Sequence, residues 1–477
     1  MKLLFEPRTI LWLMLLSIHS LVPCWSQVSP QPRPNILLLL TDDQSFDTIA
    51  ELGNTEIITD NLDRLALRGT TFGNAYNMGG WNGAICLASR AMFNTGRFLW
   101  RAHAVDNTLE QESQAGRLLP CMMEQAGYET FMSGKWHIKI PADKIYEHVV
   151  HVRPGMPSTV ASSYQRPNKN RDWAPWDTRL GGYWEGGKHW SEVLADDAKS
   201  FLSLAAKSDR PFFMVLAFNA PHDPRQAPRE FVSRYNRSEI EIPANFLPQH
   251  PTMEAMGAGR SLRDERLAPW PRTTQAVQLH RQEYYALITH LDQQIGIILD
   301  ELERTGQAAN TYIVMTSDHG LACGQHGLLG KQNLYEHSLK APLIVAGPGI
   351  PAGKRIETPV YVQDFVATAL EWAHVPQPEH VEFKSLLPLI RGESLQQYEL
   401  IYGAYEQDKQ RMVRRGDMKL IHYPAVDKYE MYDLSRDPLE LQDLSQAAKH
   451  ARAFGELQVD MQTIMRSMDD PMLQATK

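Results

Sequence analysis

Residues 35–43 read NILLLLTDD, an apolar run that ends directly in two acidic residues. A short, continuous apolar run of this kind is typical of a strand that is buried on both faces. Similar runs recur along the chain, with amphipathic helical patterns between them, at residues 128–132, 212–218, 312–315 and 343–345. Strands that alternate with helices predict an α/β fold, in which a large, mostly parallel sheet is sandwiched by helices.

Two helical patterns can be placed in more detail. Residues 284–302 carry apolar side chains at three-to-four spacing, which predicts an amphipathic helix. A shorter helix follows Asp60, which could cap its first turn.

The chain changes character near residue 391. Short strands with a Gly416-Asp417 turn signal replace the alternating pattern, at residues 401–405, 412–415, 418–423 and 429–434. A helical pattern over about residues 441–468 closes the chain. We therefore predict a main domain at residues 33–390 and, at 391–477, a small antiparallel sheet subdomain with a terminal helix.

Composition sets limits on function. The chain has 477 residues, of which 43% are hydrophobic and 22% charged, as in ordinary globular proteins. Its formal net charge of −8 argues against a nucleic-acid partner, because such proteins usually present a basic face. Any site for an anion must therefore be built locally from a metal ion, Lys, Arg and His.

The first 26 residues differ from the rest. Lys2 and Arg8 precede an apolar run over residues 10–22, and small or turn-forming residues follow it. This order predicts a secretory signal peptide at residues 1–26 and export to the periplasm or the cell exterior. The alternative is a membrane anchor, but the run is shorter than the ~20 residues that a span needs, so we expect no stable membrane insertion. After cleavage three cysteines remain, too few for a disulfide framework: Cys86, Cys121 and Cys323.

Polar clusters follow four of the predicted strands. In open α/β sheets, ligands bind at the edge where the carboxyl ends of the strands lie. Each cluster alone has an ordinary interpretation, such as a turn or a helix cap. The convergence of four distant segments favours one site, built from Asp42-Asp43, Lys135-Trp136-His137, His222-Asp223 and Asp318-His319.

The residue types suggest the chemistry of this site. Three carboxylates and an imidazole suit a hard divalent cation such as Ca²⁺ or Mg²⁺. Lys135 and His137 would share one face of an extended chain, which suits an anion. Cys86, at the start of a helix with Arg90 nearby, would have its thiolate favoured, although a buried and inert cysteine is the alternative.

The stretch from Cys86 to Arg90, CLASR, resembles the signature of the formylglycine-dependent sulfatases, the type I sulfatases of the alkaline-phosphatase-like superfamily. The family's other motifs follow in order, and the resemblance spans about residues 33–445. They are NILLLLTDD at 35–43, GKWH at 134–137, APH at 220–222, SDHG at 317–320, GK at 330–331, GDMKL at 416–420 and YDL at 432–434. One departure is Ala88, where the signature usually has Pro, and it bears on which maturase modifies the chain.

The resemblance implies a mechanism and assigns residues to it. A formylglycine-generating maturase would convert Cys86 to formylglycine, and residues 33–390 would form the catalytic domain. One Ca²⁺ per chain would be held by residue 86 together with Asp42, Asp43, Asp318 and His319. A hydroxyl of the hydrated aldehyde would attack sulfur, and positive side chains would offset the sulfate charge. The catalytic set would be completed by Arg90, Lys135, His137, His222 and Lys331, with His222 and Lys331 protonating the leaving alcohol.

An aromatic segment suggests the substrate class. Trp173, Trp176, Tyr183, Trp184 and Trp190 are interleaved with Arg171, Arg179 and Lys188. Aromatic rings stack on sugar faces, which favours a sulfated carbohydrate, whereas internal packing is the alternative. Three further interpretations stay open: a choline or aryl sulfatase, a phosphoester or phosphonate hydrolase of the same superfold, and a non-catalytic sulfoglycan-binding protein with an unmodified Cys86.

Overall fold

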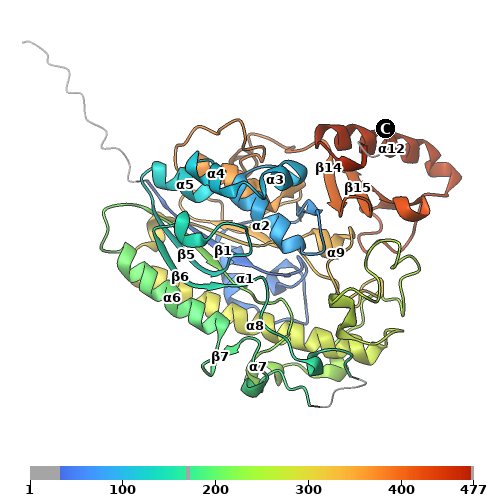
Figure 1. The fold of residues 1–477 in the computed structure, drawn as a ribbon, viewed down its shortest axis with the longest axis horizontal. Coiled ribbons are helices and arrows are strands. Elements are labelled where there is room, and N and C mark those ends of the chain that lie inside the picture. Colours follow the sequence, from blue (N-terminus) through green and yellow to red (C-terminus); the bar gives the residue numbers. More distant parts are fainter. Residues whose placement is uncertain (1–32, 168–171, 474–477) are drawn as a thin grey trace, which may run out of the picture. The chain divides into compact units, whose positions relative to one another are not determined.

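The central element of the fold is strand β1 (Asn35–Thr41), which lies in the middle of an eight-stranded sheet. The computed structural model describes residues 33–167 and 172–473 (Figure 1). The predicted signal peptide lies outside the described residues. The sheet order is β12-β2-β11-β10-β1-β9-β5-β6. β1 pairs in parallel with β9 (Phe212–Ala217) on one side and β10 (Thr311–Ser317) on the other.

The outer strands complete a mostly parallel sheet. β5 (Glu129–Lys135) pairs in parallel with β9 and with β6 (His148–Arg153). Beyond β10, β11 (Leu343–Ala346) runs antiparallel to its two neighbours, β10 and β2 (Thr70–Phe72). β12 (Lys354–Ile356) returns to a parallel pairing with β2. The five predicted strands all exist, and the α/β prediction is confirmed.

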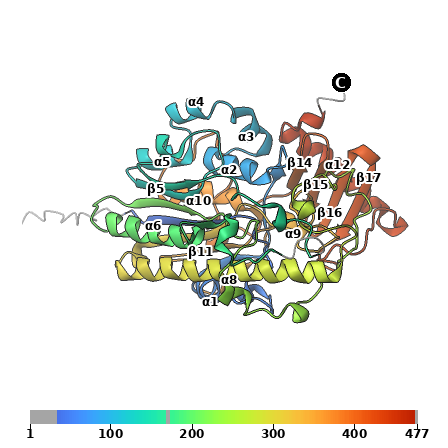
Figure 2. The same ribbon diagram turned by 60° about the horizontal axis from the view of Figure 1, so that its bottom comes forward.

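Helices cover both faces of this sheet because its strands are apolar on both faces. Leu37 and Leu39 of β1 belong to one hydrophobic core, and Ile36, Leu38 and Leu40 to the other. The first core includes side chains of α1 (Asp60–Arg68), α6 (Trp190–Ala205) and α8 (Thr274–Arg304). The second includes side chains of α2 (Ile85–Thr95), α5 (Leu119–Gln125) and α10 (Phe365–Trp372). α6 and α8 run along the same side of the sheet (Figure 2).

Both detailed helix predictions need correction at their starts. The helix expected at 284–302 belongs to α8, which begins at Thr274. The Thr273 hydroxyl accepts the N–H of Ala276 at 3.2 Å and so caps this earlier start. Asp60 is the first residue of α1, and the capping position belongs to Thr59.

The C-terminal sheet contains the four predicted strands and one more. They are β14 (Ile401–Tyr405), β15 (Gln410–Arg415), β16 (Met418–Tyr423) and β17 (Lys428–Asp433). β4 (Gly79–Gly80) adds a parallel edge next to β14, so a segment from the main domain takes part in this sheet. α12 (Ala451–Ser467) contacts β14, β15 and β16 (Figure 1). By contacts, residues 33–477 form one unit, and the boundary at 391 stays a prediction.

The terminal helix is shorter than predicted. α12 begins at Ala451, and the ten residues before it form turns and one short 3-10 segment, Ala448–His450. The Asp437 carboxylate accepts the N–H groups of Leu441 and Gln442 at 3.0 and 2.8 Å. Such bonds from a side chain to the backbone hold residues 441–442 in a turn at the point where the helix was predicted to begin.

The remaining elements are short. The strands are β3 (Ala75–Tyr76), paired with β13 (Val360–Tyr361), and β7 (Trp184–Glu185), paired with β8 (Lys188–His189). The helices are α3 (Leu99–Val105), α4 (Leu109–Gln114), α7 (Arg229–Val232), α9 (Glu336–Leu339) and α11 (Leu387–Arg391). Within the described residues, no helix combines the length and the apolar character that crossing a bilayer requires. Cys86, Cys121 and Cys323 are buried free thiols.

Candidate active site

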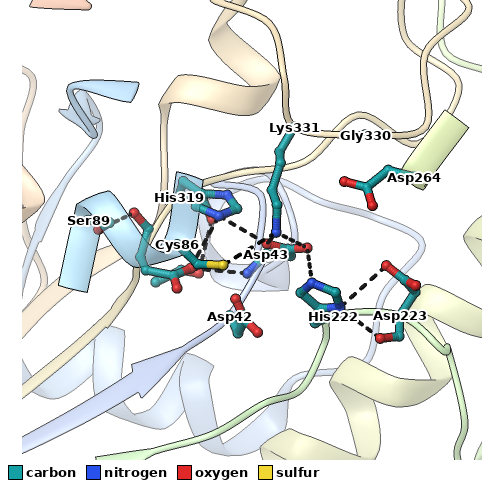
Figure 3. A network of polar contacts seen from close by, with 12 residues as sticks. Asp42, Asp43, Cys86, Ser89, His222, Asp223, Asp264, His319, Gly330 and Lys331 are labelled. Atoms are coloured by element: carbon teal, nitrogen blue, oxygen red, sulfur yellow. Dashed lines mark hydrogen bonds and ion pairs between the residues drawn. The ribbon is translucent and has the colours of Figure 1, made fainter. Parts of the chain in front are cut away.

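The four predicted polar clusters meet at one edge of the main sheet. Asp42 follows β1, Lys135 ends β5, His222 follows β9 and Asp318 follows β10. These strands are neighbours in the order β10-β1-β9-β5, so their carboxyl ends lie side by side. Cys86, near the start of α2, faces the same place (Figure 3). The structure thus brings together side chains that lie far apart in the sequence.

Cys86 lies in a buried, positively charged environment. Its Sγ is 3.5 Å from Nδ1 of His137 and 3.8 Å from Nζ of Lys331, and the residue is 3% exposed. Burial raises the pKa of the thiol, but the charges of Lys135 and Lys331 outweigh this and hold the pKa well below its usual value. The start of α2 adds a further preference for negative charge. Residue 86 is therefore placed to carry a negative charge.

Asp43 is the centre of a second set of contacts. Lys331 Nζ donates to both of its carboxylate oxygens, at 2.7 and 3.0 Å. His319 Nε2 lies 3.1 Å from one oxygen, and His222 Nε2 lies 3.6 Å from the other. Burial raises the pKa of Asp43, and Lys331 opposes that rise. Asp43 therefore links the residues predicted to bind the metal with those predicted to act on the leaving alcohol (Figure 3).

Several groups of acidic, His and Cys side chains lie close together in the described part of the chain, and one of them lies at the carboxyl ends of the strands beside Cys86. Ligand atoms of Asp42, Cys86, Asp318 and His319 all lie within 4.8 Å of one another. Asp42 Oδ1 is buried and has no hydrogen-bond partner within the described part of the chain. Burial and the nearby Asp318 raise the pKa of Asp42 well above its usual value, so this carboxylate is poorly stabilised by the protein alone. The two carboxylates of this set suit a hard cation such as Ca²⁺, and an oxygen in place of the Cys86 sulfur would suit it better. Asp43 is the one predicted ligand outside this set.

Arg90 and Lys135 hold the two carboxylates in place. Arg90 Nε donates to Asp318 Oδ2 at 3.1 Å, and its Nη1 donates to the carbonyl of Lys135 at 2.8 Å. Although burial raises the pKa of Asp318, His319 and Arg90 lower it below its usual value, so this carboxylate stays ionised. Lys135 Nζ donates to Asp42 Oδ2. Arg90 therefore contacts the metal-binding set, and no contact joins it to Cys86 among the described interactions.

Three polar residues of the site were missed by sequence reasoning. Asn77 Nδ2 and Ser89 Oγ both donate to the backbone carbonyl of Asp318, at 2.7 and 2.8 Å. Gln363 Nε2 in turn donates to Ser89 Oγ at 3.0 Å. Ser89 lies inside the quoted signature, but nothing in the sequence links Asn77 or Gln363 to it.

His222 is fixed by its loop and by Tyr183. The Tyr183 hydroxyl lies 2.6 Å from the carbonyl oxygen of Asn219 and 2.9 Å from that of His222. The ring of His222 places Nδ1 2.7 Å from the carbonyl oxygen of Asp223. Burial and the charge of Lys331 lower the pKa of His222 well below its usual value. The ring is therefore neutral near pH 7 and presents Nε2 to Asp43.

The position of the His137 ring depends on the close approach of the backbone at Gly155. Its own φ of 58° lies in the left-handed region, which is rare for residues other than glycine and often marks functional sites. A Cβ at Gly155 would lie 2.6 Å from two atoms of the His137 ring. Glycine at position 155 thus leaves room for the ring next to Cys86.

The aromatic segment does not act as one unit. Tyr183 is buried beneath His222, and two of the predicted substrate-reading cations pair with neighbouring acids, Arg179 with Asp177 and Lys188 with Asp196. Trp173 and Trp176 line a separate pocket together with Arg229. Arg171 lies outside the described residues. Internal packing therefore accounts for Tyr183, whereas Trp173 and Trp176 face another site.

Comparison with known proteins agrees with this geometry. Residues 34–375 match the sulfatase family, and residues 324–467 match the C-terminal region of N-sulphoglucosamine sulphohydrolase. An N-acetylglucosamine-6-O-sulfatase of Bacteroides thetaiotaomicron is 27% identical, over 95% of this chain and 89% of that protein. A choline-sulfatase of Rhizobium meliloti is 29% identical, over 87% of this chain and 83% of that protein.

Solved structures share the fold. A protein in complex with its substrate D-glucosamine-2-N,6-O-disulfate aligns with a TM-score of 0.70 at 24% identity, over 92% of this chain and 98% of that one. A phosphonate monoester hydrolase from Silicibacter pomeroyi aligns with a TM-score of 0.73 at 21% identity, over 92% and 96%. The family match covers most of the chain and includes the whole of the catalytic cluster. The chain therefore belongs to the sulfatase family and is a sulfuric ester hydrolase.

Proposed function

We propose that the protein releases sulfate from a sulfated carbohydrate, using formylglycine at position 86 and one Ca²⁺. The observation that supports this most directly is the set formed by Asp42, Cys86, Asp318 and His319, whose ligand atoms all lie within 4.8 Å of one another. A reactive side chain at position 86 would therefore lie beside the cation. In the modified protein, the position of Sγ would be taken by an oxygen of the aldehyde or its hydrate.

The cation and the formylglycine would supply two functions that unmodified side chains do not. The cation would offset charge on the sulfate, and the hydrated aldehyde would provide a hydroxyl nucleophile and a way to release sulfate afterwards. Asp42, Asp318 and His319 would hold the cation together with residue 86. The unpartnered Oδ1 of Asp42 supports this assignment, because a buried carboxylate oxygen without a partner is costly.

The remaining residues would handle charge and protons. Lys135 and Lys331 surround the place where sulfate would lie and would offset its negative charge. His222, next to Lys331 and Asp43, would give a proton to the departing alcohol. Because the ring is neutral in the free site, it would have to take up this proton when the negative charge of bound sulfate offsets that of Lys331. His137, with Nδ1 3.5 Å from the Sγ of residue 86, would take a proton from the group at that position.

The proposed substrate class rests on the names of the relatives. The sulfatases of Bacteroides thetaiotaomicron and Homo sapiens that resemble this chain act, by name, on N-acetylglucosamine 6-sulfate. We therefore place a sulfated amino sugar first among substrates to test. We also propose that residues 1–26 direct export, and that a formylglycine-generating maturase acts on Cys86 before the chain is active.

A panel of esters tests the proposed function. Sulfate release would be measured from N-acetylglucosamine 6-sulfate, choline sulfate and 4-nitrophenyl sulfate, and product release from a matched phosphate monoester and phosphonate monoester. We expect the sugar sulfate to give the highest kcat/KM and Cys86→Ala to abolish turnover. Higher turnover of choline sulfate, of the aryl sulfate or of a phosphorus ester would contradict the carbohydrate assignment.

The mass of the peptide that carries residue 86 tests the modification separately. Oxidation of the thiol to an aldehyde replaces sulfur by oxygen and removes two hydrogens, which lowers the peptide mass. An unmodified thiol in a preparation that binds sulfated sugars without cleaving them would instead support a binding protein.

A further inference from the structure

Arg263 contacts both segments that carry the residues proposed to act on the leaving alcohol, His222 and Lys331. Its Nη1 donates to the carboxylate of Asp223, the residue that follows His222, and its Nη2 pairs with the carboxylate of Asp264. The Arg263 side chain is 30% exposed, whereas the side chains of the two aspartates are 6% and 3% exposed. One partly exposed guanidinium therefore compensates two buried carboxylates at the edge of the catalytic cluster.

Asp223 orients the ring of His222 from the side away from Asp43. Nδ1 of His222 lies 2.7 Å from the carbonyl oxygen of Asp223 and 3.3 Å from its carboxylate oxygen Oδ1 (Figure 3). Because both of these atoms are acceptors, Nδ1 keeps a proton even in the neutral ring, and Nε2 is left to take up or release the other proton. The second carboxylate oxygen, Oδ2, is the one that Arg263 binds. Arg263 therefore holds the carboxylate that orients the ring.

Asp264 extends the contacts of Arg263 to the loop of Lys331. Its Oδ2 accepts from Nε2 of Gln332 at 2.8 Å, and the amide oxygen of Gln332 accepts the backbone N–H of Lys331 at 3.0 Å. The two segments are in close contact, since a Cβ at Gly330 would lie 2.9 Å from the Cβ of Asp264. Although burial raises the pKa of Asp264, Arg263 and Lys331 lower it below its usual value, so this carboxylate stays ionised.

We propose that Arg263 is a positioning residue, which fixes His222 and Lys331 relative to each other so that an unactivated alcohol can be protonated as it leaves. Arg263 would act through Asp223 and Asp264 rather than on the sulfate group. A guanidinium suits this role, because its planar fork can bind two carboxylates at once, whereas an ammonium is a single point of charge. The inference rests on the proposed function for the role of His222, but it does not require the alcohol to be a sugar.

The step that depends on Arg263 is the departure of the alcohol. While sulfur bonds to the nucleophile proposed at position 86, the S–O bond to the alcohol breaks and its electron pair goes to the alcohol oxygen. That oxygen takes the proton held at Nε2 of His222. A sugar alkoxide is a strong base and requires this proton, whereas a nitrophenolate leaves without it. A displaced donor should therefore cost most on esters of unactivated alcohols.

The test compares esters that differ in their leaving groups. Arg263→Gln would be assayed on N-acetylglucosamine 6-sulfate and on 4-nitrophenyl sulfate, and kcat/KM is measured because it includes the departure of the alcohol. We expect a fall of about 10²-fold for the sugar sulfate, the lower end for general acid catalysis, and of less than about threefold for the aryl ester. Arg263→Lys should recover part of the loss. The matched control is Arg260→Gln, whose exposed guanidinium donates to the amide of Gln249 at 3.3 Å.

The ratio of the two kcat/KM values distinguishes positioning from a general structural effect. Both esters are measured on one preparation, so the ratio does not depend on the fraction of folded protein. Equal losses on the two esters would overturn the proposal. Arg263→Lys provides the same comparison if Arg263→Gln does not fold.

A double variant shows whether Arg263 acts through His222. In a protein that already carries His222→Ala, Arg263→Gln should cause little further loss on the sugar sulfate, because the ring that it positions is absent. A further loss as large as in the unaltered protein would overturn the proposal.

A pair of aryl esters separates this inference from the proposed function. Phenyl sulfate and 4-nitrophenyl sulfate differ in the basicity of the leaving group, and neither contains a sugar. If the unaltered protein cleaves no sugar sulfate, the carbohydrate assignment fails, yet a larger loss on phenyl sulfate than on 4-nitrophenyl sulfate in Arg263→Gln would support the role of Arg263. In that case, equal losses on the two aryl esters would overturn it.

Discussion

The ammonium of Lys331 joins Asp43 to Cys86: Nζ lies 2.7 and 3.0 Å from the two carboxylate oxygens and 3.8 Å from Sγ. All three residues are almost fully buried. Burial lowers the pKa of Lys331, but Asp43 and Cys86 outweigh it and keep the pKa well above its usual value, so the group stays charged. The Lys331 ammonium therefore stabilises the Asp43 carboxylate, which contacts His319. The same ammonium faces residue 86, the proposed nucleophile.

Replacing Lys331 should harm both activity and stability. Lys331→Met keeps the volume but leaves Asp43 as a buried carboxylate without its main partner. We expect kcat/KM for a sulfate ester to fall about 10²–10³-fold, the typical loss of a preorganised charge. Thermal unfolding should shift to lower temperature. Lys144→Met, which removes an exposed pair with Glu110, is the control, and equal kcat/KM in the two variants would contradict the assignment.

Removing His222 should affect poor leaving groups most. His222→Ala deletes the proton donor proposed for the departing alcohol. For a sugar sulfate we expect a loss of about 10²–10⁴ in kcat, whereas 4-nitrophenyl sulfate, whose phenolate leaves without a proton, should lose much less. The measurement is kcat for both esters. An equal fall in kcat for the two esters would show that His222 does not protonate the leaving alcohol.

Chelation should inactivate the protein reversibly. Without a cation, the carboxylates of Asp42 and Asp318 lie close together in a buried site, so activity and thermal stability should both fall. Added Ca²⁺ should restore both and stabilise by about 2.7 kcal/mol at one hundred times its Kd. Asp42→Asn should need more Ca²⁺, whereas Asp408→Asn, on the surface, should not. Full activity after exhaustive chelation would contradict a cation site.

Gly155→Ala should displace the ring of His137. The added Cβ would lie 2.6 Å from the ring, so the ring must leave its place beside residue 86. We expect kcat to fall about tenfold or more, as for a misplaced catalytic group. Gly455→Ala in α12 is the matched control, because no atom lies within 4 Å of its Cβ. The measurement is kcat of both variants, corrected for the fraction of folded protein. Unchanged kcat in Gly155→Ala would show that catalysis does not require the position of the His137 ring.

Asp364 should make stability fall as pH rises. Burial raises its pKa from 3.8 to about 7, even though Tyr398 and the N–H of Lys384 donate to it. The folded chain then binds a proton that the unfolded chain has lost, so the free energy of unfolding decreases between pH 4 and 7 by about 4 kcal/mol from this group. Asp364→Asn should flatten this slope in urea unfolding across that range. A slope as steep as that of the unaltered protein would contradict the shift.

Local patterns explain which elements could be predicted. β1, β14 and β16 match the predicted runs because an apolar or alternating strand shows its pattern within a few residues. The edge strand β4 consists of two glycines, which carry no such pattern. The contacts by which Asp437 holds residues 441 and 442 in a turn could be seen only with the side chain in place.

The site follows a similar rule. Asp42, Lys135, His222 and Asp318 were predictable because each lies at the end of a recognisable strand. Asn77 and Gln363 were not, because Asn77 acts on the backbone carbonyl of Asp318 and Gln363 on Ser89. Their partners are set by tertiary contacts, which leave no spacing to read along the chain. The aromatic segment was predicted either to contact a sugar substrate or to pack internally, and its composition could not show that Trp173 and Trp176 line a pocket without any of the predicted catalytic residues.

The pairing of β4 with β14 sets an order of events during biosynthesis. Gly79–Gly80 lie just ahead of Cys86, and their partner strand is synthesised more than three hundred residues later. Until the ribosome has delivered that strand, the stretch around the cysteine has no partner at this edge and is open to an enzyme. In the folded chain Cys86 is buried. We therefore expect the proposed oxidation to happen on a nascent or unfolded polypeptide, and a chain that folds first would keep an unmodified Cys86.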